Sequence, residues 1–574
     1  MKQEILQFIR QNNLSPFNQS KTQLKPLESI YKTTDAKKVH NRTLQKISQN
    51  FIFTETSNIF NFFQFTNDIT EIKKRQLFFS NLQNIKLENS FLNNLEKPRN
   101  WWKPRYDVIV VTEDAETFTK LKQMNCPVQI IISEQDAVLL EDKDVVQIIN
   151  CPEFQIALES LPQAVFYKNL EEIYLERYLE QFSGHIKNLE IIKQNSTIKS
   201  LKELTGEFIP LIPLTKDGES NSIDPDEIES KIILANHKIE EKIKQLTLSG
   251  TSLIQILSKG DLPDELKKAI DETIDELNIP RQILEIGIPL KLDEEELNKL
   301  IQHQNANEFS ELAERIKDNS DKLKQIPEKL KELSDLILYF DFLSGISKFI
   351  NQEMNFPEIN HELSIQKSNN IFLENPQPIS FNLSENIQAS ILTGANSGGK
   401  TTLVEHILQL ITLTQLGLPQ SGKNKFPLFE EIYYFAKNKG SNLKGAFETL
   451  LTQMSRIKPG NKTLILADEI EAVTEPGVAG NIIAATTDYY IKQNCYLVIA
   501  THLGHEIQKI LPQKTRIDGI EAKGLTENFE LIVNHNPVLG KLAHSTPELI
   551  VEKMANKENK EYFNFLNDFL KKKK

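Results

Sequence analysis

Gly394-Ala395-Asn396-Ser397-Gly398-Gly399-Lys400-Thr401 is the most informative segment in this chain of 574 residues. It fits the phosphate-loop pattern G-x-x-x-x-G-K-[ST]. The apolar run before it, residues 389–393, is typical of a short buried strand, and apolar residues after it recur at helical spacing until Gly417 and Pro419. A strand, loop and helix in this order direct backbone N–H groups and the positive end of the helix dipole at one anionic site.

The loop residues have distinct expected roles at such a site. The glycines let the backbone close around phosphate groups without an obstructing Cβ atom. Lys400 can reach the β- and γ-phosphates, and the Thr401 hydroxyl can coordinate Mg²⁺. The sequence therefore predicts that ATP and Mg²⁺ bind here, with contacts from Gly394, Ala395, Asn396, Ser397, Gly398, Gly399, Lys400, Thr401 and Thr402.

A second apolar strand, expected over residues 463–467, is followed by Asp468 and Glu469. In phosphate-loop ATPases the first acid of such a pair holds Mg²⁺ and the second polarises the attacking water. Two carboxylates at the end of a buried strand would also be costly without a cation or substrate nearby. We therefore predict Asp468 as a metal ligand, together with Thr401, and Glu469 as a catalytic residue.

A third strand is expected over residues 496–500, followed by Thr501 and His502. A histidine after a strand is commonly a satisfied core or capping residue. His502 follows the paired acids by one helix, however, where ATPases of the ABC superfamily place a contact to the γ-phosphate, so we predict a catalytic role. The three strands should end at the same edge of one parallel sheet, where ligands bind in such folds.

The composition sets limits on the class of protein. Hydrophobic residues make up 39% and charged residues 25%, as in ordinary globular proteins. No apolar run approaches the roughly 20 residues that span a bilayer, and the N-terminus does not read as a signal peptide. Three scattered cysteines fit a reducing cytoplasm. Because the net charge is −12, contact with nucleic acid would need local basic patches.

The patterning predicts four consecutive segments. They are a mostly helical region at 1–105, a small α/β unit at 106–160, a helical core with a coiled-coil arm at 161–365, and an α/β phosphate-loop ATPase domain at 366–574. In the small unit we expect three buried strands near residues 108–111, 128–132 and 145–149. This unit has no glycine-rich loop, which favours a structural role.

Two series of apolar residues at coiled-coil spacing predict the arm. The first is Ile228, Ile232, Ala235, Ile239, Ile243 and Leu246, and the second is Leu312, Ile316, Leu323, Leu330 and Leu333. The polar pair Asn319 and Ser320 interrupts the second series, and Pro327 should kink it. We expect a long antiparallel helical pair with a small tip between the series, and a compact helical bundle is the alternative.

From residue 370 to residue 554 the sequence resembles the MutS family of DNA-repair ATPases. The loop resembles T-G-P-N-x-G-G-K-[ST], with Ala395 where proline is usual. Asp468-Glu469-Ile470 with Thr474-Glu475-Pro476-Gly477 resembles the acidic strand and the loop after it in the branch associated with recombination control. Thr501-His502-Leu503 completes the set. Residues 545–552 resemble the terminal helix of archaeal MutS-like proteins, and Ser545 with Glu548 would form a capping box.

The resemblance implies an ABC-superfamily ATPase fold, a homodimer with dimerisation helices at the carboxyl-terminal end, and a signature segment that reaches the partner's nucleotide. The best alignment places Gly445 where that segment normally carries serine, so a backbone N–H would contact the phosphate without a hydroxyl. Mismatch readers of the family carry Phe-x-Glu on an N-terminal domain. Because this spacing recurs along the chain, as at Phe53/Glu55, Phe309/Glu311, Phe356/Glu358 and Phe372/Glu374, we assign none. We also expect no Smr nuclease domain.

These features predict an ATP-dependent, homodimeric DNA-binding protein of the MutS family that hydrolyses ATP and senses branched or recombining DNA. One alternative is a MutS-like ATPase that acts on ribosomes or structured RNA. Another is a coiled-coil protein that binds ATP with little turnover. A soluble ABC subunit that serves a membrane partner is disfavoured by the large helical region before the ATPase. The aromatic residue that packs on adenine stays open, with Phe372 as a candidate.

Overall fold

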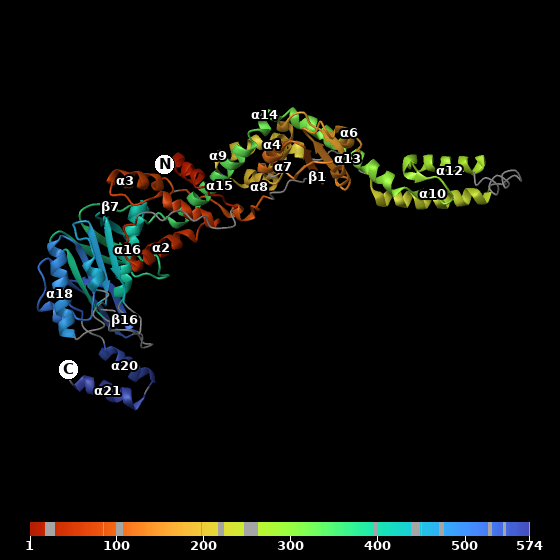
Figure 1. Cartoon of the computed structure of the whole chain (residues 1–574). Helices are drawn as coiled ribbons and strands as arrows, with labels where there is room; N and C mark the ends of the chain where they lie inside the picture. The colour runs from red at the N-terminus through yellow and green to blue at the C-terminus, as the bar shows by residue number, and fades with distance from the viewer. Residues whose placement is uncertain are drawn as a thin grey trace. The chain divides into compact units, whose positions relative to one another are not determined.

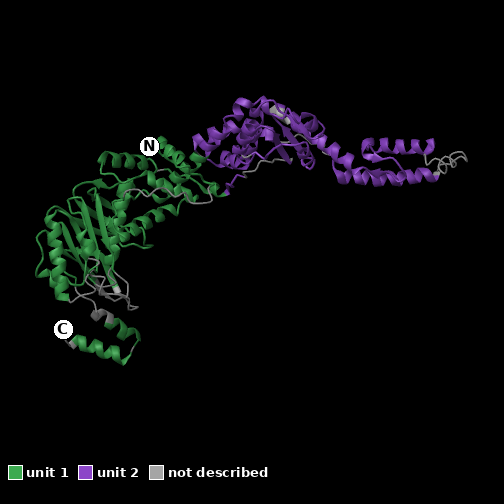
Figure 2. Cartoon of the chain, viewed as in Figure 1, with its two compact units in different colours: residues 1–93, 334–574 green, residues 94–333 purple. Residues whose placement is uncertain are grey.

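A computed structural model describes most of the chain: residues 1–17, 29–83, 85–98, 107–124, 126–196, 198–215, 223–245, 262–394, 399–437, 448, 451–469, 476–525, 531–543, 547–558 and 560–572. It divides into two compact units (Figure 2), the first formed by residues 1–93 with 334–574 and the second by residues 94–333. The first unit thus joins the amino-terminal segment to the carboxyl-terminal half. The division into four consecutive segments stays a prediction.

The main sheet of the first unit carries the three predicted strands. Its strands run in the order β12 (Glu431–Phe435), β13 (Thr463–Asp468), β14 (Tyr496–Ala500), β10 (Ala389–Gly394), β15 (Thr515–Leu525) and β16 (Leu531–Leu539). The first five are parallel to their neighbours, and only β16 is antiparallel, to β15. β10, β13 and β14 therefore end at one edge, which confirms the expectation for residues 394, 468 and 500.

Helices cover both faces of this sheet (Figure 1). Successive side chains of a strand point to opposite faces, so each apolar strand contributes side chains to both buried clusters. Leu392, Leu464 and Val498 pack in one buried cluster with α16 (Lys400–Leu416). Their neighbours Ile391, Ile465 and Leu497 pack in the other with α18 (Pro476–Lys492) and the short α19 (Gly504–Gln508). The result is an α/β sheet with a buried core on each side, as the continuous apolar strands predict.

A smaller sheet is formed by three strands that precede β10 in the chain and by one that follows α16. Its order is β7 (Glu358–Ile359), β11 (Lys423–Phe426), β8 (Leu363–Ser368) and β9 (Ile379–Leu383). The loop between β8 and β9 lies beside α16, since Ile371 N donates to Gln409 Oε1 at 3.1 Å. The carboxyl-terminal helices of the unit are α20 (Pro547–Glu558) and α21 (Glu561–Lys572).

The amino-terminal residues complete the first unit. Their elements are α1 (Lys2–Gln11), α2 (Thr34–Ser48), η1 (Thr54–Phe62), α3 (Ile69–Ser80) and η2 (Ser90–Asn94). Side chains of α1, η1 and α3 form an apolar cluster with residues of α15 (Ile326–Phe349) and with Leu413 and Leu416 of α16. The amino-terminal region is therefore packed directly on the helix that follows the phosphate loop.

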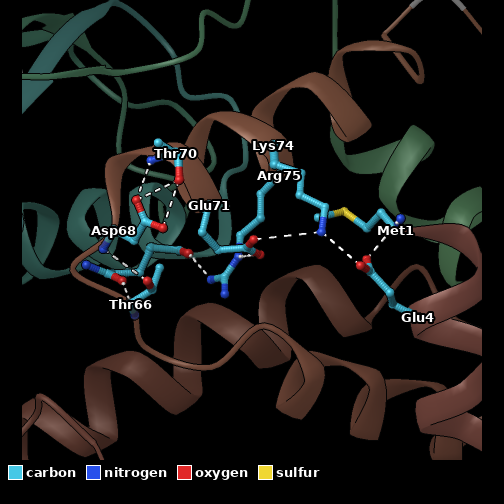
Figure 3. Close-up of polar contacts among 9 residues, drawn as sticks. Met1, Glu4, Thr66, Asp68, Thr70, Glu71, Lys74 and Arg75 are labelled. Carbon is cyan, nitrogen blue, oxygen red and sulfur yellow. Dashed lines mark hydrogen bonds and ion pairs between the residues drawn. The ribbon is translucent and has the colours of Figure 1, made fainter.

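Polar contacts fix α3 in this position (Figure 3). Asp68 caps the helix by accepting a 2.8 Å hydrogen bond from Thr70 N, and Lys74 pairs with Glu4 of α1 at 2.9 Å. The buried Arg75 donates to the backbone oxygen of Gln415 at 2.8 Å, at the end of α16. A cation at this end complements the free carbonyl groups and the helix dipole.

Residues 30–33 cover the outer edge of the main sheet. Tyr31 forms a parallel bridge with Ile432 of β12, and Lys32 N donates to Ile432 O at 2.9 Å. The Thr33 hydroxyl both donates to Tyr434 O at 2.7 Å and accepts from Tyr434 N at 2.9 Å. This pairing protects an otherwise open strand edge and leads directly into α2.

The second unit contains the predicted α/β sheet, with one strand more than expected. Its parallel strands run in the order β2 (Val128–Ile130), β1 (Val108–Thr112), β3 (Val145–Ile148) and β4 (Ala164–Phe166). The fourth strand carries the unit past residue 160. Its helices are α4 (Ala115–Gln123), α5 (Gln135–Val138), α6 (Gln155–Glu159), α7 (Leu170–Ser183), α8 (Ile186–Asn195), α9 (Lys199–Phe208) and η3 (Ile209–Thr215).

The first coiled-coil series lies on α10 (Pro225–Gln245), except for Leu246, which is outside the described residues, and its packing partners differ from the expected ones. Ile228, Ile232, Ala235 and Ile239 are buried against α12 (Asp264–Glu276), the region from η4 (Arg281–Ile283) to β5 (Leu284–Glu285) and β6 (Lys291–Leu292), and the start of α13 (Glu294–Lys317). α10 and α12 lie side by side (Figure 1). The segment between the two series, where the sequence predicts a small tip, thus supplies the helix that packs on α10. It can do so because α12 is itself amphipathic.

The second series is split between helices, as its polar interruption predicts. α13 ends at Lys317, α14 covers Ser320–Leu323, and α15 begins at Ile326. Pro327 was expected to kink a continuous helix. It lies instead in the first turn of α15, where its missing N–H removes no helical hydrogen bond. Among the described residues, no helix is both long and apolar enough to cross a membrane.

Candidate nucleotide site

The phosphate loop leaves β10 at Gly394 and enters α16 at Lys400. Gly394 and Gly399 have φ values of +137° and +94°, which favour glycine. A Cβ atom at Gly394 would lie 2.4 Å from Ile520 O, and one at Gly399 would lie 2.8 Å from His535 Nδ1. Both glycines are therefore required by close approach as well as by backbone conformation. Residues 395–398 of the predicted site lie outside the described residues.

Lys400 is buried at the start of α16, with 3% of its surface exposed. Its Nζ donates to Gly394 O at 2.7 Å and lies 3.6 Å from Glu469 Oε1. The ammonium group therefore lies between the beginning of the phosphate loop and the end of β13, the acidic strand. A phosphate group bound in the loop would meet this charge directly.

Asp468 and Thr401 lie together as predicted. Thr401 Oγ1 donates to Asp468 Oδ2 at 2.5 Å, and burial raises the pKa of the Asp468 carboxyl above its ordinary value. Asp468 Oδ1 is buried without a hydrogen-bond partner in the described structure. A buried oxygen that lacks a donor, beside a hydroxyl, fits the coordination that Mg²⁺ takes from one carboxylate, one hydroxyl and substrate phosphates.

Mg²⁺ does not need a complete set of protein ligands to bind at such a site. Among the described residues, no group of three or more His, Cys, Asp or Glu side chains could hold a metal ion. Mg²⁺ in nucleotide sites usually keeps several waters and is bound by one or two protein groups together with phosphates. The pair of Thr401 and Asp468 is therefore a suitable set of protein ligands for a metal that arrives with its nucleotide.

Three basic residues, Lys400, Lys437 and His502, approach Glu469. His502 Nε2 lies 2.6 Å from its Oε1, and Lys437 Nζ forms an ion pair with its Oε2. Burial by itself would raise the pKa of Glu469. The bond from Lys437 and the charges of His502 and Lys400 outweigh it and hold the pKa below the ordinary value. Glu469 is thus an ionised carboxylate, which is the form that can orient and deprotonate water.

The backbone at Glu469 is also unusual. Its φ of +48° lies in the left-handed region, which costs about 1 kcal/mol for a residue other than glycine. Its N–H donates to Ala500 O at 2.8 Å, and Thr501 N donates to Leu392 O at 2.9 Å. These bonds tie the ends of β13, β14 and β10 together. They bring Lys400, Glu469 and His502 to one place, as expected from the parallel sheet.

The sequence also predicts nucleotide contacts from Thr402 and Gly445. Thr402 lies in the first turn of α16, where its backbone oxygen accepts from Asn370 Nδ2 at 3.5 Å. Gly445 lies outside the described residues, as do Ile470, Thr474 and Glu475 of the acidic-strand motif and Ser545 of the capping box. The role of Gly445 therefore stays a prediction.

The sequence patterns missed Lys437 and His535. Lys437 lies two residues beyond the end of β12, and β12 pairs with β13 so that Phe435 is opposite Ala467. Lys437 meets Glu469 two residues beyond that pair on each strand. His535 reaches Gly399 from β16. Strand pairing across long stretches of sequence creates both contacts, and a lone lysine or histidine carries no local signal of them.

Phe372 lies in the loop that is held against α16. Asn370 Oδ1 accepts from Phe372 N at 2.9 Å and from Gln409 Nε2 at 3.0 Å, which fixes the backbone before the ring. The guanidinium carbon of Arg42, from α2, lies 4.1 Å from the centre of the Phe372 ring. The ring is half-buried and packs on the apolar core, with the Arg42 guanidinium over it, and its contact with adenine stays a prediction.

Comparison with known proteins identifies relatives of this chain. No protein-family model matches it. The DNA-binding protein MutS2 of Pyrococcus furiosus is 31% identical over an alignment that covers 94% of this chain and 99% of that protein. The endonucleases MutS2 of Fusobacterium nucleatum and Caldanaerobacter subterraneus are each 22% identical over 59% and 60% of this chain.

The extent of these similarities differs between the relatives. The alignments cover 44% and 47% of the two bacterial endonucleases, so this chain spans less than half of their length. With the Pyrococcus furiosus protein the similarity extends over nearly the whole of both chains. Similarity of that degree and extent shows that the chain belongs to the MutS family.

Proposed function

We propose that this protein is an ATPase that binds DNA and whose affinity for DNA depends on whether ATP or ADP is bound. The single observation that carries the ATPase assignment is the meeting of Lys400, Glu469 and His502 at the ends of β10, β13 and β14, with Glu469 Oε1 2.6 Å from His502 and 3.6 Å from Lys400. A lysine, a carboxylate and a histidine around one point match the needs of phosphoryl transfer to water.

In the proposed reaction, each side chain has one task. Lys400 neutralises charge on the β- and γ-phosphates, and Thr401 and Asp468 would hold Mg²⁺, which supplies positive charge against the phosphate oxygens. Glu469 accepts a proton from the water that attacks the γ-phosphorus, and the bond between that phosphorus and the ADP oxygen breaks. His502 contacts the γ-phosphate and helps to distinguish ATP from ADP. The gain comes from positioning and charge stabilisation.

DNA is the proposed macromolecular partner. The Pyrococcus furiosus relative, which this chain matches over 99% of its length, is named a DNA-binding protein. We place the chain with such archaeal-type members and propose a homodimer in which Gly445 of one protomer contacts the nucleotide of the other. Branched or recombining DNA is the proposed substrate, and the three buried free cysteines suit a reducing cytoplasm.

A parallel binding assay tests this function. The full-length protein is titrated against a four-way DNA junction, a linear duplex of the same length and ribosomes, at one stated salt concentration, with ADP or a non-hydrolysable ATP analogue. We expect tightest binding to the junction and a clear difference between the two nucleotides. The Lys400→Ala variant should lose that difference, because it loses the nucleotide contact.

Two results would contradict the proposal. Preferential binding to ribosomes would favour an RNA-directed ATPase of the same family. The second is an affinity for DNA that is the same with ADP, with the ATP analogue and without nucleotide. A ligand shifts an equilibrium only if it binds one state more tightly, so this result would show that the ATP site has no role in DNA binding.

A further inference from the structure

Both oxygens of the Glu469 carboxylate are occupied, and by different partners. His502 and Lys400 approach Oε1 at 2.6 Å and 3.6 Å, whereas Lys437 pairs with Oε2. Lys400 is the first residue of α16, directly after the phosphate loop, and His502 follows the end of β14. Lys437 comes from the opposite side, because β12 is the outer neighbour of β13. The carboxylate is therefore held between two groups that would face the phosphates and one that would not.

The position of Lys437 is set by backbone structure on both sides of β12. On the inner side, β12 and β13 pair up to Phe435 and Ala467, and Lys437 meets Glu469 two residues beyond that pair on each strand. On the outer side, Thr33 binds Tyr434 through two hydrogen bonds, and Asp35 Oδ2 accepts from Ala436 N at 3.3 Å. The residue before Lys437 is thus fastened to the start of α2, so the lysine leaves a fixed backbone.

We propose that Lys437 is a positioning residue for ATP hydrolysis, which holds Glu469 by Oε2 and thereby directs Oε1 at the attacking water. The inference rests on the proposed ATPase function and adds a residue to that site. When phosphates bind in the loop, Lys400 and His502 are expected to engage them. Lys437 is then the contact that remains on the carboxylate, and it keeps the orientation that Lys400 and His502 no longer enforce.

The geometry gives Lys437 no chemical step of its own. In the hydrolysis described above, the water proton passes to Glu469 Oε1, the water oxygen bonds to the γ-phosphorus and the electron pair of the broken bond stays on ADP. Lys437 remains charged throughout and acts through its ion pair with the Glu469 carboxylate. Lys437 acts by orienting the Glu469 carboxylate. A misplacement of about 1 Å in a reacting group can lower a rate by about 10²-fold.

Replacement by methionine tests this role, because methionine keeps the length of the side chain and removes its charge. We expect Lys437→Met to lower kcat for ATP by about 10- to 100-fold while the affinity for nucleotide, measured by binding of a fluorescent ATP analogue, changes less than about threefold. Lys437→Arg should restore most of the lost rate, because arginine also donates to a carboxylate.

Lys462→Met is the matched control. Lys462 pairs with Glu430 at 2.6 Å, just before β13 begins and at the edge of the sheet opposite the phosphate loop, and it is exposed to a similar degree. This variant should keep the wild-type rate. Equal rates for the wild-type protein and Lys437→Met would overturn the assignment, as would a loss of rate that Lys437→Arg does not recover.

A double-variant comparison shows whether Lys437 acts through Glu469. In a Glu469→Gln background, measured by single-turnover hydrolysis, adding Lys437→Met should cause no further loss, and an additive loss would contradict the proposal. Lys400→Ala separates this inference from the proposed function. If Lys400→Ala hydrolyses ATP like the wild-type protein, the ATPase site itself is wrong. If Lys400→Ala is inactive and Lys437→Met is not impaired, only the role of Lys437 fails.

Discussion

Thr401 Oγ1 donates a 2.5 Å hydrogen bond to Asp468 Oδ2, while Asp468 Oδ1 is buried without a partner among the described residues. The hydroxyl thus orients one carboxylate oxygen and leaves the other available. An unpaired buried oxygen is costly for folding, so its retention suits a group that gains a partner when the metal and nucleotide bind. The relationship connects the first helical turn after the phosphate loop to the end of β13.

The first prediction concerns Mg²⁺. In the wild-type protein, nucleotide affinity should rise when Mg²⁺ is added, because Asp468 and Thr401 help to hold the ion. Asp468→Asn keeps an oxygen for the Thr401 bond but loses the negative charge, so this gain should fall by about tenfold or more. A titration of fluorescent nucleotide with and without Mg²⁺ measures it. An unchanged response to Mg²⁺ would place the metal elsewhere.

The second prediction concerns Lys400. Lys400→Ala removes the buried ammonium group that lies 2.7 Å from Gly394 O and 3.6 Å from Glu469 Oε1. We expect ATP hydrolysis to be abolished, because charge on the β- and γ-phosphates is no longer neutralised. Steady-state phosphate release from the purified protein measures this. Turnover that survives the substitution would show that the site lies elsewhere or that the activity belongs to a contaminant.

The third prediction concerns the end of α16. Gly417 has a φ of +79°, and a Cβ atom there would lie 2.3 Å from Arg75 Cβ. Gly417→Ala should therefore lower the free energy of unfolding by more than the roughly 1 kcal/mol of left-handed strain alone. Gly206→Ala is the control, and it should raise the free energy of unfolding. Gly206 lies in α9 with no neighbouring atom within 4 Å of its Cβ position, and alanine favours the helical conformation. Urea unfolding of both variants measures the difference.

The fourth prediction concerns pH. His406 of α16 is buried and is hydrogen-bonded to Gln409 and Ser368, and burial lowers its pKa from the ordinary value of 6.5 to about 4. Between these values the unfolded chain takes up a proton that the folded protein does not. The free energy of unfolding should therefore fall as the pH decreases from 6.5 towards 4, by up to about 3 kcal/mol from this residue.

Replacing His406 with asparagine tests that assignment. The variant has no proton to gain at this position, so its stability should depend less steeply on pH over the same range. Denaturant unfolding at several pH values measures the slope. Equal slopes for His406→Asn and the wild-type protein would mean that other groups, such as the half-buried His40 and His185, whose pKa values are also lowered, account for the acid dependence.

The sequence predicted the parts of the fold that depend on local pattern. The strands at 389, 463 and 496 and the helix that ends at Gly417 follow from apolar periodicity and from glycine at a helix end. Asp468, Glu469 and His502 were expected at one sheet edge, because parallel strands place their carboxyl ends together. The meeting of Glu469 with His502 is thus a consequence of topology that a motif can anticipate.

The remaining features depend on contacts between distant parts of the chain. Thr33 binds Tyr434, and this pairing positions Lys437 against Glu469, but neither residue shows a local pattern that identifies its partner. For the same reason the sequence predicts only a small tip where α12 forms, although the apolar face of α12 packs on α10. Periodicity shows that a face is buried, whereas the partner of that face depends on the tertiary structure.

The most direct test of the central claim is a comparison of the wild-type protein with Glu469→Gln for both nucleotide binding and ATP hydrolysis. Glutamine preserves the size and the backbone position of residue 469 but cannot accept the water proton. We predict that binding of a fluorescent ATP analogue persists and that hydrolysis falls by at least about 10²-fold, the usual contribution of a general base. Hydrolysis by Glu469→Gln at the wild-type rate would contradict this account of the site.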